Sequence, residues 1–462
     1  MFPFLYYNID VVGVQSDMGG TILHFTTELG RDTVGGVGTF VNELRRVSGP
    51  RVRFAHLVPA ERSPFAPRAG ISGTIEPDAV ADGVGAIMHG SRPTDDAKAS
   101  AAARARNDDE TLDEARTIRA AFYDMDILNA LTFDVAVFHH YALAYLVSPS
   151  FLRGRPLVFV VHSVPTTEPW SLLDPYGGNG AIARSFEKLC DAADAIVCVS
   201  DAERGKLLTL YPDLEAKTSA IANGFSAFGA PGRDLPPVVR GVRRTFGFLG
   251  RPDYRKGLRE LVRDMAEIDG SLRIGCDLGD ASATEYVRAV RDAADARGAS
   301  PKLRWDGRIG ETDKLAFLRS LDALIVPSRW EPFGYVALEA IRAGITPLIS
   351  RRGGMPEIVG PGYPYTFDPY VPGDIGACVR RFQADDAAAV RAALAQARRH
   401  AERLTAESTA AAYDALAEAL TASAASATGG DGATTNKRRY GGKGPYLSPS
   451  YANASATPMR NE

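Results

Sequence analysis

Residues 321–339 read Leu-Asp-Ala-Leu-Ile-Val-Pro-Ser-Arg-Trp-Glu-Pro-Phe-Gly-Tyr-Val-Ala-Leu-Glu. The apolar part, residues 321–328, predicts a buried parallel strand. Pro332 and Gly334 then turn the chain, and residues 334–343 have helical spacing and composition. A strand that leads through a tight turn into a helix is the building unit of parallel α/β sheets, so this stretch predicts that fold class.

Two glutamates bracket the turn. Glu331 is expected in the loop at the carboxyl end of the strand, and Glu339 on the second turn of the helix. Between them, the backbone N–H groups of Phe333, Gly334 and Tyr335 point out of a helix N-terminus, which favours an anion. Carboxylates suit sugar hydroxyls, so the arrangement predicts a sugar-nucleotide site. A glutamate pair alone is more often ordinary surface charge, and the prediction therefore depends on the rest of the chain.

Strand-like and helical patterns alternate along the chain in two series. The expected strands of the first series are Thr21–Phe25, Val52–Val58, Val84–His89, Val135–His139, Leu157–His162, Ala195–Ser200 and Thr218–Ala222. After a Pro/Gly-rich join at residues 229–239, the expected strands are Thr245–Leu249, Leu272–Cys276, Leu303–Asp306, Ala323–Val326 and Pro347–Ser350. This alternation predicts an α/β protein with two doubly wound, Rossmann-like domains facing a cleft, in which ligands bind beyond the carboxyl ends of the strands.

The expected boundaries follow from the same pattern. The first domain spans residues 18–235 and the second 240–405, and the Ala-rich residues 385–425 are helical, with a last helix at 406–425. The remaining segments are a possible N-terminal extension at 1–17, an exposed helix at 97–116 and a disordered tail at 428–462.

Composition limits the classes of partner. A formal net charge of −3 over 462 residues gives no general attraction to nucleic acid or to anionic membranes. No run of eighteen apolar residues is present, so neither a transmembrane helix nor stable membrane association is expected. Scattered cysteines without histidines at ligand spacing predict reduced, buried thiols, a cytoplasmic protein and no zinc site. These cysteines are Cys190, Cys198, Cys276 and Cys378.

A basic loop opens the second domain. Gly250-Arg251 ends the first strand of that domain, and Lys256-Gly257 stands just before the following helix. Two cations at such a place suit a diphosphate, whose charge they neutralise as it leaves. Alone, these two residues would be read as ordinary surface cations. Beside the Glu331 loop, a diphosphate-binding role is favoured.

Glycines and histidines mark the strand ends of the first domain. Gly35-Gly36-Val37-Gly38 opens a helix where the backbone can approach a phosphate or a sugar closely. His162 ends a strand beside a polar loop that contains Glu168 and Trp170. His139-His140 ends the preceding strand, and because adjacent strand residues point to opposite faces, packing or an acceptor contact is favoured over a metal site.

Seven stretches stand in the order found in the retaining GT-B glycosyltransferases of family 4, which are related to bacterial glycogen synthases. They are residues 35–38, 160–163, 193–200, 221–224, 250–257, 327–340 and 353–359. The chain resembles this family over about residues 21–425. The loop at 162–178 is most similar to the branch of glycogen and maltose-phosphate synthases.

The resemblance implies a role for each matching position. Arg251 and Lys256 would hold the donor diphosphate, Glu339 the ribose and Glu331 the donor sugar. The helix near 406–425 would cross back to the first domain. The expected catalytic residues are His162, Arg251, Lys256 and Glu331. The expected donor-binding residues are Gly36, Arg251, Lys256, Arg308, Ile309, Glu331, Phe333, Gly334, Tyr335 and Glu339, and the expected acceptor-binding residues are Gly38, His140, Glu168 and Trp170.

The family mechanism is front-face substitution with retention of the anomeric configuration. The acceptor attacks on the side from which the diphosphate leaves, and a phosphate oxygen takes its proton. Neither a metal nor a cofactor is expected, since Arg251 and Lys256 neutralise the leaving group. Removal of Lys256 or Glu331 should lower turnover greatly with little loss of folding.

The acceptor is the least determined element. Residues 360–368, close to the donor, depart from the family pattern, and residues 62–94 and 97–116 match none. We expect a small-molecule acceptor of specialised metabolism. The alternatives are a glucosyltransferase like the glycogen and maltose-phosphate synthases, or a non-catalytic sugar-nucleotide-binding protein, with a nucleotide-sugar 2-epimerase ranked lower. The base, the donor sugar, the attacking atom and the oligomeric state stay open.

Overall fold

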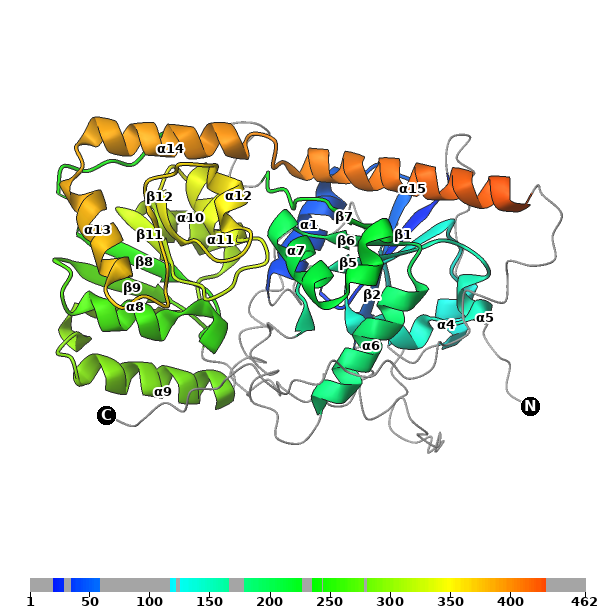
Figure 1. Ribbon diagram of the computed structural model, residues 1–462, viewed down its shortest axis with the longest axis horizontal. Coiled ribbons are helices and arrows are strands. Elements are labelled where there is room, and N and C mark those ends of the chain that lie inside the picture. The colour runs from blue at the N-terminus through cyan, green and yellow to red at the C-terminus, as the bar shows by residue number, and fades with distance from the viewer. Residues whose placement is uncertain are drawn as a thin grey trace, which may run out of the picture.

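Two parallel sheets stand side by side in this computed structural model (Figure 1). The structure describes residues 20–28, 35–58, 117–121, 125–165, 178–226, 235–242, 244–277 and 281–428. The expected extension at 1–17, strand at 84–89, helix at 97–116 and tail from residue 429 lie outside the described residues.

The first sheet has seven strands in the order β3-β2-β1-β4-β5-β6-β7, all paired in parallel. Its strands are β1 Ile22–Thr26, β2 Val52–Val58, β3 Thr117–Ala121, β4 Val135–Phe138, β5 Leu157–Val161, β6 Ala195–Cys198 and β7 Thr218–Ala220. The strand order reverses between β1 and β4. In a doubly wound sheet, that reversal is where a ligand-binding crevice opens beyond the carboxyl ends of the strands.

The second sheet has six parallel strands in the order β10-β9-β8-β11-β12-β13. They are β8 Thr245–Leu249, β9 Ser271–Gly275, β10 Leu303–Gly307, β11 Ala323–Val326, β12 Thr346–Ser350 and β13 Thr366–Phe367. Here the order reverses between β8 and β11. The loops after these two strands are the ones that carry Arg251 and Glu331.

Helices connect the strands in both halves. In the first they are α1 Gly36–Val47, α4 Met125–Ala130, the 3₁₀ helix η4 Tyr141–Leu146, α5 Pro149–Leu152, α6 Gly178–Ala192, α7 Asp201–Leu210 and the 3₁₀ helix η7 Pro212–Lys217. In the second they are η8 Tyr254–Lys256, α8 Leu258–Met265, α9 Ala281–Asp295, η9 Ser300–Lys302, α10 Glu311–Arg319, α11 Tyr335–Arg342, α12 Met355–Val359, α13 Asp374–Ala384, α14 Ala387–Ala401 and α15 Ala406–Thr428.

The expected strands that lie in the described part of the chain are confirmed to within two residues at each end. Strands β3 and β13, which both lie at the edges of their sheets, were not predicted from the sequence. Strand β13 has only two residues, and β3 is short and interrupted by Arg119, so neither presents a continuous apolar run; the other two edge strands, β7 and β10, were predicted. The helical stretch expected at 385–425 contains two helices, α14 and α15, and α15 begins at Ala406, where the last helix was expected.

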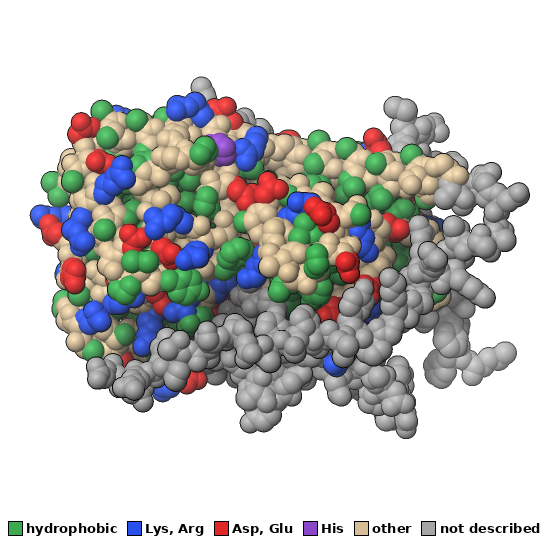
Figure 2. All heavy atoms as spheres, in the orientation of Figure 1, with side chains coloured by type: hydrophobic (Ala, Val, Ile, Leu, Met, Phe, Trp, Pro, Cys, Tyr) green, Lys and Arg blue, Asp and Glu red, His purple; other side chains and the backbone are tan. Residues whose placement is uncertain are grey.

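Alternation along the strands of the first sheet separates two hydrophobic clusters. Ile22 and Phe54 face one cluster, and Leu23 and Phe25 face the other. The first cluster continues into the second half of the molecule, so the two halves share a core. On the face shown in Figure 2, acidic and basic side chains are interspersed, which agrees with the small net charge.

Helix α15 returns to the first sheet, as the resemblance implied. It packs against α1 and β4, and Arg51 forms ion pairs with Asp414 (3.2 Å) and Glu418 (2.9 Å) on it. Figure 1 shows α14 along the second half and α15 along the first. At the break between these helices, a Cβ at Gly224 would lie 1.9 Å from the Thr405 carbonyl oxygen, so only glycine fits there.

All four cysteines are free and buried, as predicted. Burial raises the pKa of each thiol, to about 11 for Cys276 and to about 12 for Cys378. Within the described part of the chain, no helix is long and apolar enough to cross a membrane.

Candidate active site

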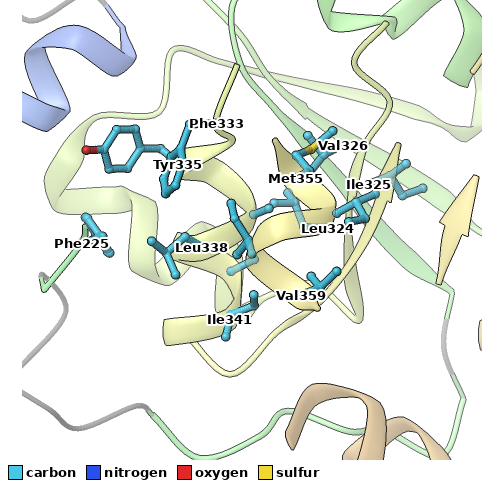
Figure 3. Packing of buried hydrophobic residues seen from close by; sticks show 14 of the residues in the cluster. Phe225, Leu324, Ile325, Val326, Phe333, Tyr335, Leu338, Ile341, Met355 and Val359 are labelled. Carbon is cyan, nitrogen blue, oxygen red and sulfur yellow. The ribbon is translucent and has the colours of Figure 1, made fainter. Parts of the chain in front are cut away.

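Arg251, Lys256 and Glu331 lie in the loops that follow β8 and β11, where the strand order reverses, whereas Arg308 and Ile309 follow the edge strand β10. Helix α11 is packed on this sheet by Leu338 and Ile341, which belong to the same core as Leu324 and Ile325 of β11 (Figure 3). The loops that carry polar side chains are thus held on a rigid apolar base.

Lys256 and Glu331 form the centre of the site. The Lys256 Nζ lies 2.7 Å from Oε2 of Glu331, although the two residues are 75 positions apart. The Ser328 hydroxyl donates to the same carboxylate oxygen at 3.0 Å. Burial opposes charge on Glu331, but Lys256 and Arg255 beside it hold the pKa of its carboxyl below the ordinary value. Glu331 is therefore an ionised carboxylate at neutral pH.

Two glycines hold this pair in place. Gly257 has φ +68°, and a Cβ there would lie 1.9 Å from the Pro327 carbonyl oxygen, so the Lys256 loop closes directly onto the end of β11. Gly353 has φ +85°, and its Cβ would lie 2.1 Å from the Glu331 carbonyl oxygen. Side chains are excluded at both positions by the conformation and by the close approach of two backbones.

The N-terminus of α11 opens beside this pair. None of the amides of Phe333, Gly334, Tyr335 and Val336 donates a hydrogen bond to another described residue. These N–H groups and the positive end of the helix dipole can accept an anion. The arrangement expected from the sequence is therefore present in the geometry.

Tyr335 links this helix end to the first half. A Cβ added at Gly36 would lie 3.6 Å from Cδ2 of Tyr335, so the N-terminus of α1 faces that of α11 at short range. The Tyr335 hydroxyl lies 3.4 Å from the Gly224 carbonyl oxygen, and Phe333 packs edge-on against its ring (Figure 3). Two of the expected donor-binding positions, Gly36 and Tyr335, are thus brought together.

Glu339 is buried and paired. Its Oε1 accepts from Lys314 Nζ at 2.8 Å, and Lys314 also binds Glu311 at 2.7 Å. Burial raises the pKa of the Glu339 carboxyl and Lys314 opposes that rise. No described residue donates to the second oxygen of Glu339, which leaves it one acceptor for a ligand hydroxyl.

The other cationic positions are more open. Arg251 is half-exposed, and its Nε lies 3.9 Å from Asp253. Arg308 is exposed and lies 3.4 Å from Asp277. Ile309 packs against the end of β9 at Gly275. The structure therefore places Arg308 and Ile309 at the same edge of the sheet without direct contact to Glu331.

His162 begins a chain of three hydrogen-bonded histidines. Its Nε2 lies 3.1 Å from Nδ1 of His139, and the Nε2 of His139 lies 2.8 Å from Nδ1 of His24. Phe40 of α1 packs on two of these rings, and Tyr413 of α15 packs on His24. This chain runs from the ends of β5 and β4 to the middle of β1, so it ties His162 to the centre of the sheet.

All three histidines are neutral at physiological pH. Burial lowers the pKa of His24 to about 3 and that of His162 to about 3, and it also lowers the pKa of His139 well below the ordinary value. A neutral imidazole has one N–H donor and one acceptor nitrogen, so each hydrogen bond between two of these rings uses the N–H of one ring and the acceptor nitrogen of the other. The ring atoms outside these two hydrogen bonds are Nε2 of His24 at one end and Nδ1 of His162 at the other, and at the His162 end Nδ1 and the backbone are the groups that can meet a ligand.

The expected acceptor-binding residues have varied positions. The amide of Gly38 donates to Oε2 of Glu28 at 3.1 Å, as does that of Gly35 at 3.0 Å, so a carboxylate already lies at the N-terminus of α1. His140 accepts from the Ala142 amide at 3.1 Å and begins η4. The other two expected residues, Glu168 and Trp170, lie outside the described residues.

Several site contacts were missed from the sequence. They involve Glu28, Lys314, Ser328 and His24, whereas His139 makes contacts of the kind that the sequence favoured, ring packing and hydrogen bonds. His24 did leave a signal, since it is a polar residue within the apolar run of β1. Lys314 left none, because its partner lies on another helix 25 positions away.

Two family models match the chain in succession. Glycosyltransferase Family 4 matches residues 91–227, and Glycosyl transferases group 1 matches residues 238–401. Their junction falls at the Pro/Gly-rich join between the two sheets.

Individual proteins are similar over parts of the chain. An alpha-maltose-1-phosphate synthase of Mycolicibacterium smegmatis is 30% identical over 46% of this chain and 58% of its own length. A glycogen synthase of Mycobacterium tuberculosis is 30% identical over 50% of this chain and 55% of its own length. The chain thus spans a little over half the length of these curated relatives. The structure of a sucrose-phosphate synthase from Thermosynechococcus elongatus superposes with a TM-score of 0.61 at 17% identity, over 87% of this chain and 99% of that one.

Proposed function

Because this chain belongs to the GT-B glycosyltransferases of the family 4 type, we propose that it transfers a sugar from a nucleoside-diphosphate sugar to an acceptor. The observation that carries the proposal is the Lys256–Glu331 pair beside the open amides of α11. A cation, a carboxylate and unpaired N–H groups in one place match the diphosphate and the hydroxyls of such a donor.

The expected site residues divide between the parts of the donor. Lys256 and Arg251 bind the diphosphate, with the α11 amides and the Gly36 backbone on either side of it. Glu331 accepts from hydroxyls of the donor sugar, and the second oxygen of Glu339 accepts from the ribose. Arg308 and Ile309 line the site of the nucleotide base. Within the molecule, residues 18–235 form the acceptor domain and 240–405 the donor domain in this proposal.

The proposed reaction is front-face substitution with retention and without a metal. The bond between the sugar C1 and the diphosphate oxygen breaks, and the acceptor oxygen bonds to C1 on the same face. The acceptor proton passes to the departing phosphate oxygen. Lys256 and Arg251 stabilise the negative charge that develops on this oxygen, because cations held in position lower the energy of such a transition state. His162, held by His139, fixes the face at which the acceptor enters.

Two acceptor classes follow from different observations. Residues 62–94 and 97–116, which contain none of the stretches that resemble the family, motivate a specialised small-molecule acceptor. The named relatives instead favour a glucosyltransferase like the maltose-phosphate and glycogen synthases, and this second class has the more direct support. A panel that contains glucose 1-phosphate, a malto-oligosaccharide and non-sugar hydroxyl compounds distinguishes the two.

The test is acceptor-dependent release of nucleoside diphosphate by the purified chain. ADP-, UDP-, GDP- and dTDP-glucose are each incubated with the acceptor panel, and the product linkage is assigned by its anomeric NMR signal. Release that needs both the donor and an acceptor, and yields an α-linked product from an α-donor, supports the proposal. Binding of a nucleotide sugar without turnover under any acceptor would favour the non-catalytic binder, and an inverted product would overturn the front-face mechanism.

A further inference from the structure

Glu203 is a fully buried carboxylate on the first turn of α7, with 0% of its surface exposed. Its amide donates to the Ser200 hydroxyl at 3.0 Å, which begins the helix. A buried carboxylate is costly unless hydrogen-bond donors reach its oxygens. The identity of those donors therefore indicates what Glu203 does.

The two oxygens of Glu203 bind the two halves of the molecule. Oε1 accepts from the Val164 amide at 2.6 Å, and Oε2 accepts from the Trp330 indole N–H at 2.8 Å. Val164 lies two residues after His162, and Trp330 directly precedes Glu331. A single carboxylate thus joins the loop that carries the site from the first half to the loop that carries it from the second.

The rest of this helix turn also contacts the second half. The Ser200 hydroxyl donates to the Pro332 carbonyl. The Glu357 carboxylate of α12 accepts from the amides of Asp201 (3.0 Å) and Ala202 (2.7 Å). Figure 1 shows α7 on the side of the first half that faces α11 and α12. Of these contacts, the one made by Glu203 reaches both site loops.

We propose that Glu203 is a positioning residue for sugar transfer: it fixes the loop after His162 against the loop that carries Glu331, and so assembles the site from both domains. The inference rests on the proposed function, which supplies the reaction to be positioned. A Gln in this place puts an NH₂ group at the position of one of the two oxygens, so the N–H donor of Val164 or of Trp330 loses its acceptor there. A shift of about 1 Å between reacting groups can lower a rate by about 100-fold.

The effect should fall on turnover rather than on donor binding. Most of the groups proposed to bind the donor, among them Lys256 and the α11 amides, belong to the second half and stay in place when the bridge is lost. In Glu203→Gln we expect kcat to fall by about 10- to 100-fold, with the KM for donor changed by less than about threefold. Trp330→Phe removes the indole N–H that donates to Glu203, and it should lower kcat in the same way.

The experiment compares Glu203→Gln, Trp330→Phe and their double variant with Glu357→Gln, the matched control. Glu357→Gln weakens the same interface without touching the bridge, so it should change kcat by less than about threefold. The double variant should be no slower than the slower single variant, because both changes break one unit. If Glu203→Gln does not fold, Trp330→Phe still carries the test.

Hydrogen exchange at the Val164 amide gives a second result that does not need activity. It should be faster in Trp330→Phe than in the unaltered protein and unchanged in Glu357→Gln, because Trp330 acts on Val164 through Glu203. Absence of turnover in the unaltered protein would contradict the proposed function and leave this exchange test standing. Three results would each overturn the role of Glu203. The first is unchanged exchange and kcat in Trp330→Phe. The others are additive losses of kcat in the double variant, or a loss of kcat in Glu357→Gln equal to that in Glu203→Gln.

Discussion

Lys256 and Glu331 form an ion pair of 2.7 Å with both side chains largely out of water, at 18% and 11% exposed. They come from the ends of two neighbouring strands, β8 and β11, and so they depend on the sheet for their distance. Burial gives the pair a structural role beside its proposed catalytic one.

Breaking the pair on one side should cost stability as well as turnover. In Lys256→Met, Glu331 keeps Arg255 and Ser328 but loses its nearest cation, so we expect up to about 3 kcal/mol of destabilisation. Loss of a charge that stabilises the leaving group should lower kcat by about 100- to 1,000-fold. Chemical unfolding and steady-state kinetics measure the two effects. The stability cost revises the expectation from the sequence that folding would hardly change.

The matched control removes both charges. Lys256→Met with Glu331→Gln leaves no unpaired buried charge, so it should be more stable than Lys256→Met alone while staying inactive. A double variant that is no more stable than the single one would show that the pair contributes nothing to folding.

Gly257 should tolerate no side chain. In Gly257→Ala, strain at positive φ adds to the clash with the Pro327 carbonyl, so we expect a loss of about 3 kcal/mol and a large fall in kcat as Lys256 moves. Gly298→Ala is the control, since Gly298 has φ +66° with nothing within 4 Å of its Cβ position. It should lose about 1 kcal/mol and keep full activity. Equal effects in the two variants would mean that the close approach at Pro327 does not matter.

The histidine chain should make the protein sensitive to acid. The pKa of His24 is lowered from 6.5 to about 3 in the fold, so between these values the unfolded chain binds a proton that the native one does not. Stability therefore falls as pH drops below 6.5, with a slope that approaches about 1.4 kcal/mol per pH unit for each such histidine. His24→Asn keeps a polar atom near the Nδ1 position and removes the titration. Its melting temperature should fall less steeply from pH 6.5 to about 4.5, and equal slopes would contradict the burial of a neutral His24.

Chelation should leave transfer nearly unchanged. In the proposed mechanism the cations of Lys256 and Arg251 neutralise the diphosphate, so excess EDTA should change kcat by less than about twofold. The assay compares rates before and after chelation, with added Mg²⁺ as the control. A loss of more than tenfold that Mg²⁺ restores would replace the metal-free mechanism.

Much of the fold followed from local sequence pattern. Several central strands are apolar runs that can be recognised alone, as in β5 and β11. Strands β3 and β13 were missed because β13 has only two residues and the short run of β3 is interrupted by Arg119. The domain limits and the cytoplasmic location stay predictions from composition and pattern.

The site was predictable only where the chemistry is local. Glu331, the α11 amides and Lys256 each stand at a strand end that the sequence marks, and parallel strands bring such ends to one edge. The bridge from Val164 through Glu203 to Trp330 spans 127 positions between its last two members, and the chain from His162 to His24 crosses three strands. Such contacts depend on side-chain directions across a sheet or a domain boundary, which residue spacing does not contain.

The most direct test of the central claim is a thermal-shift titration of the protein with ADP, UDP, GDP and dTDP, repeated on Lys256→Met. The account predicts that one nucleoside diphosphate raises the melting temperature, by the equivalent of about 2.7 kcal/mol at a hundredfold excess over its dissociation constant, and that Lys256→Met loses most of this shift. No shift with any of the four, or an equal shift in Lys256→Met, would contradict the assignment of this site to the donor diphosphate.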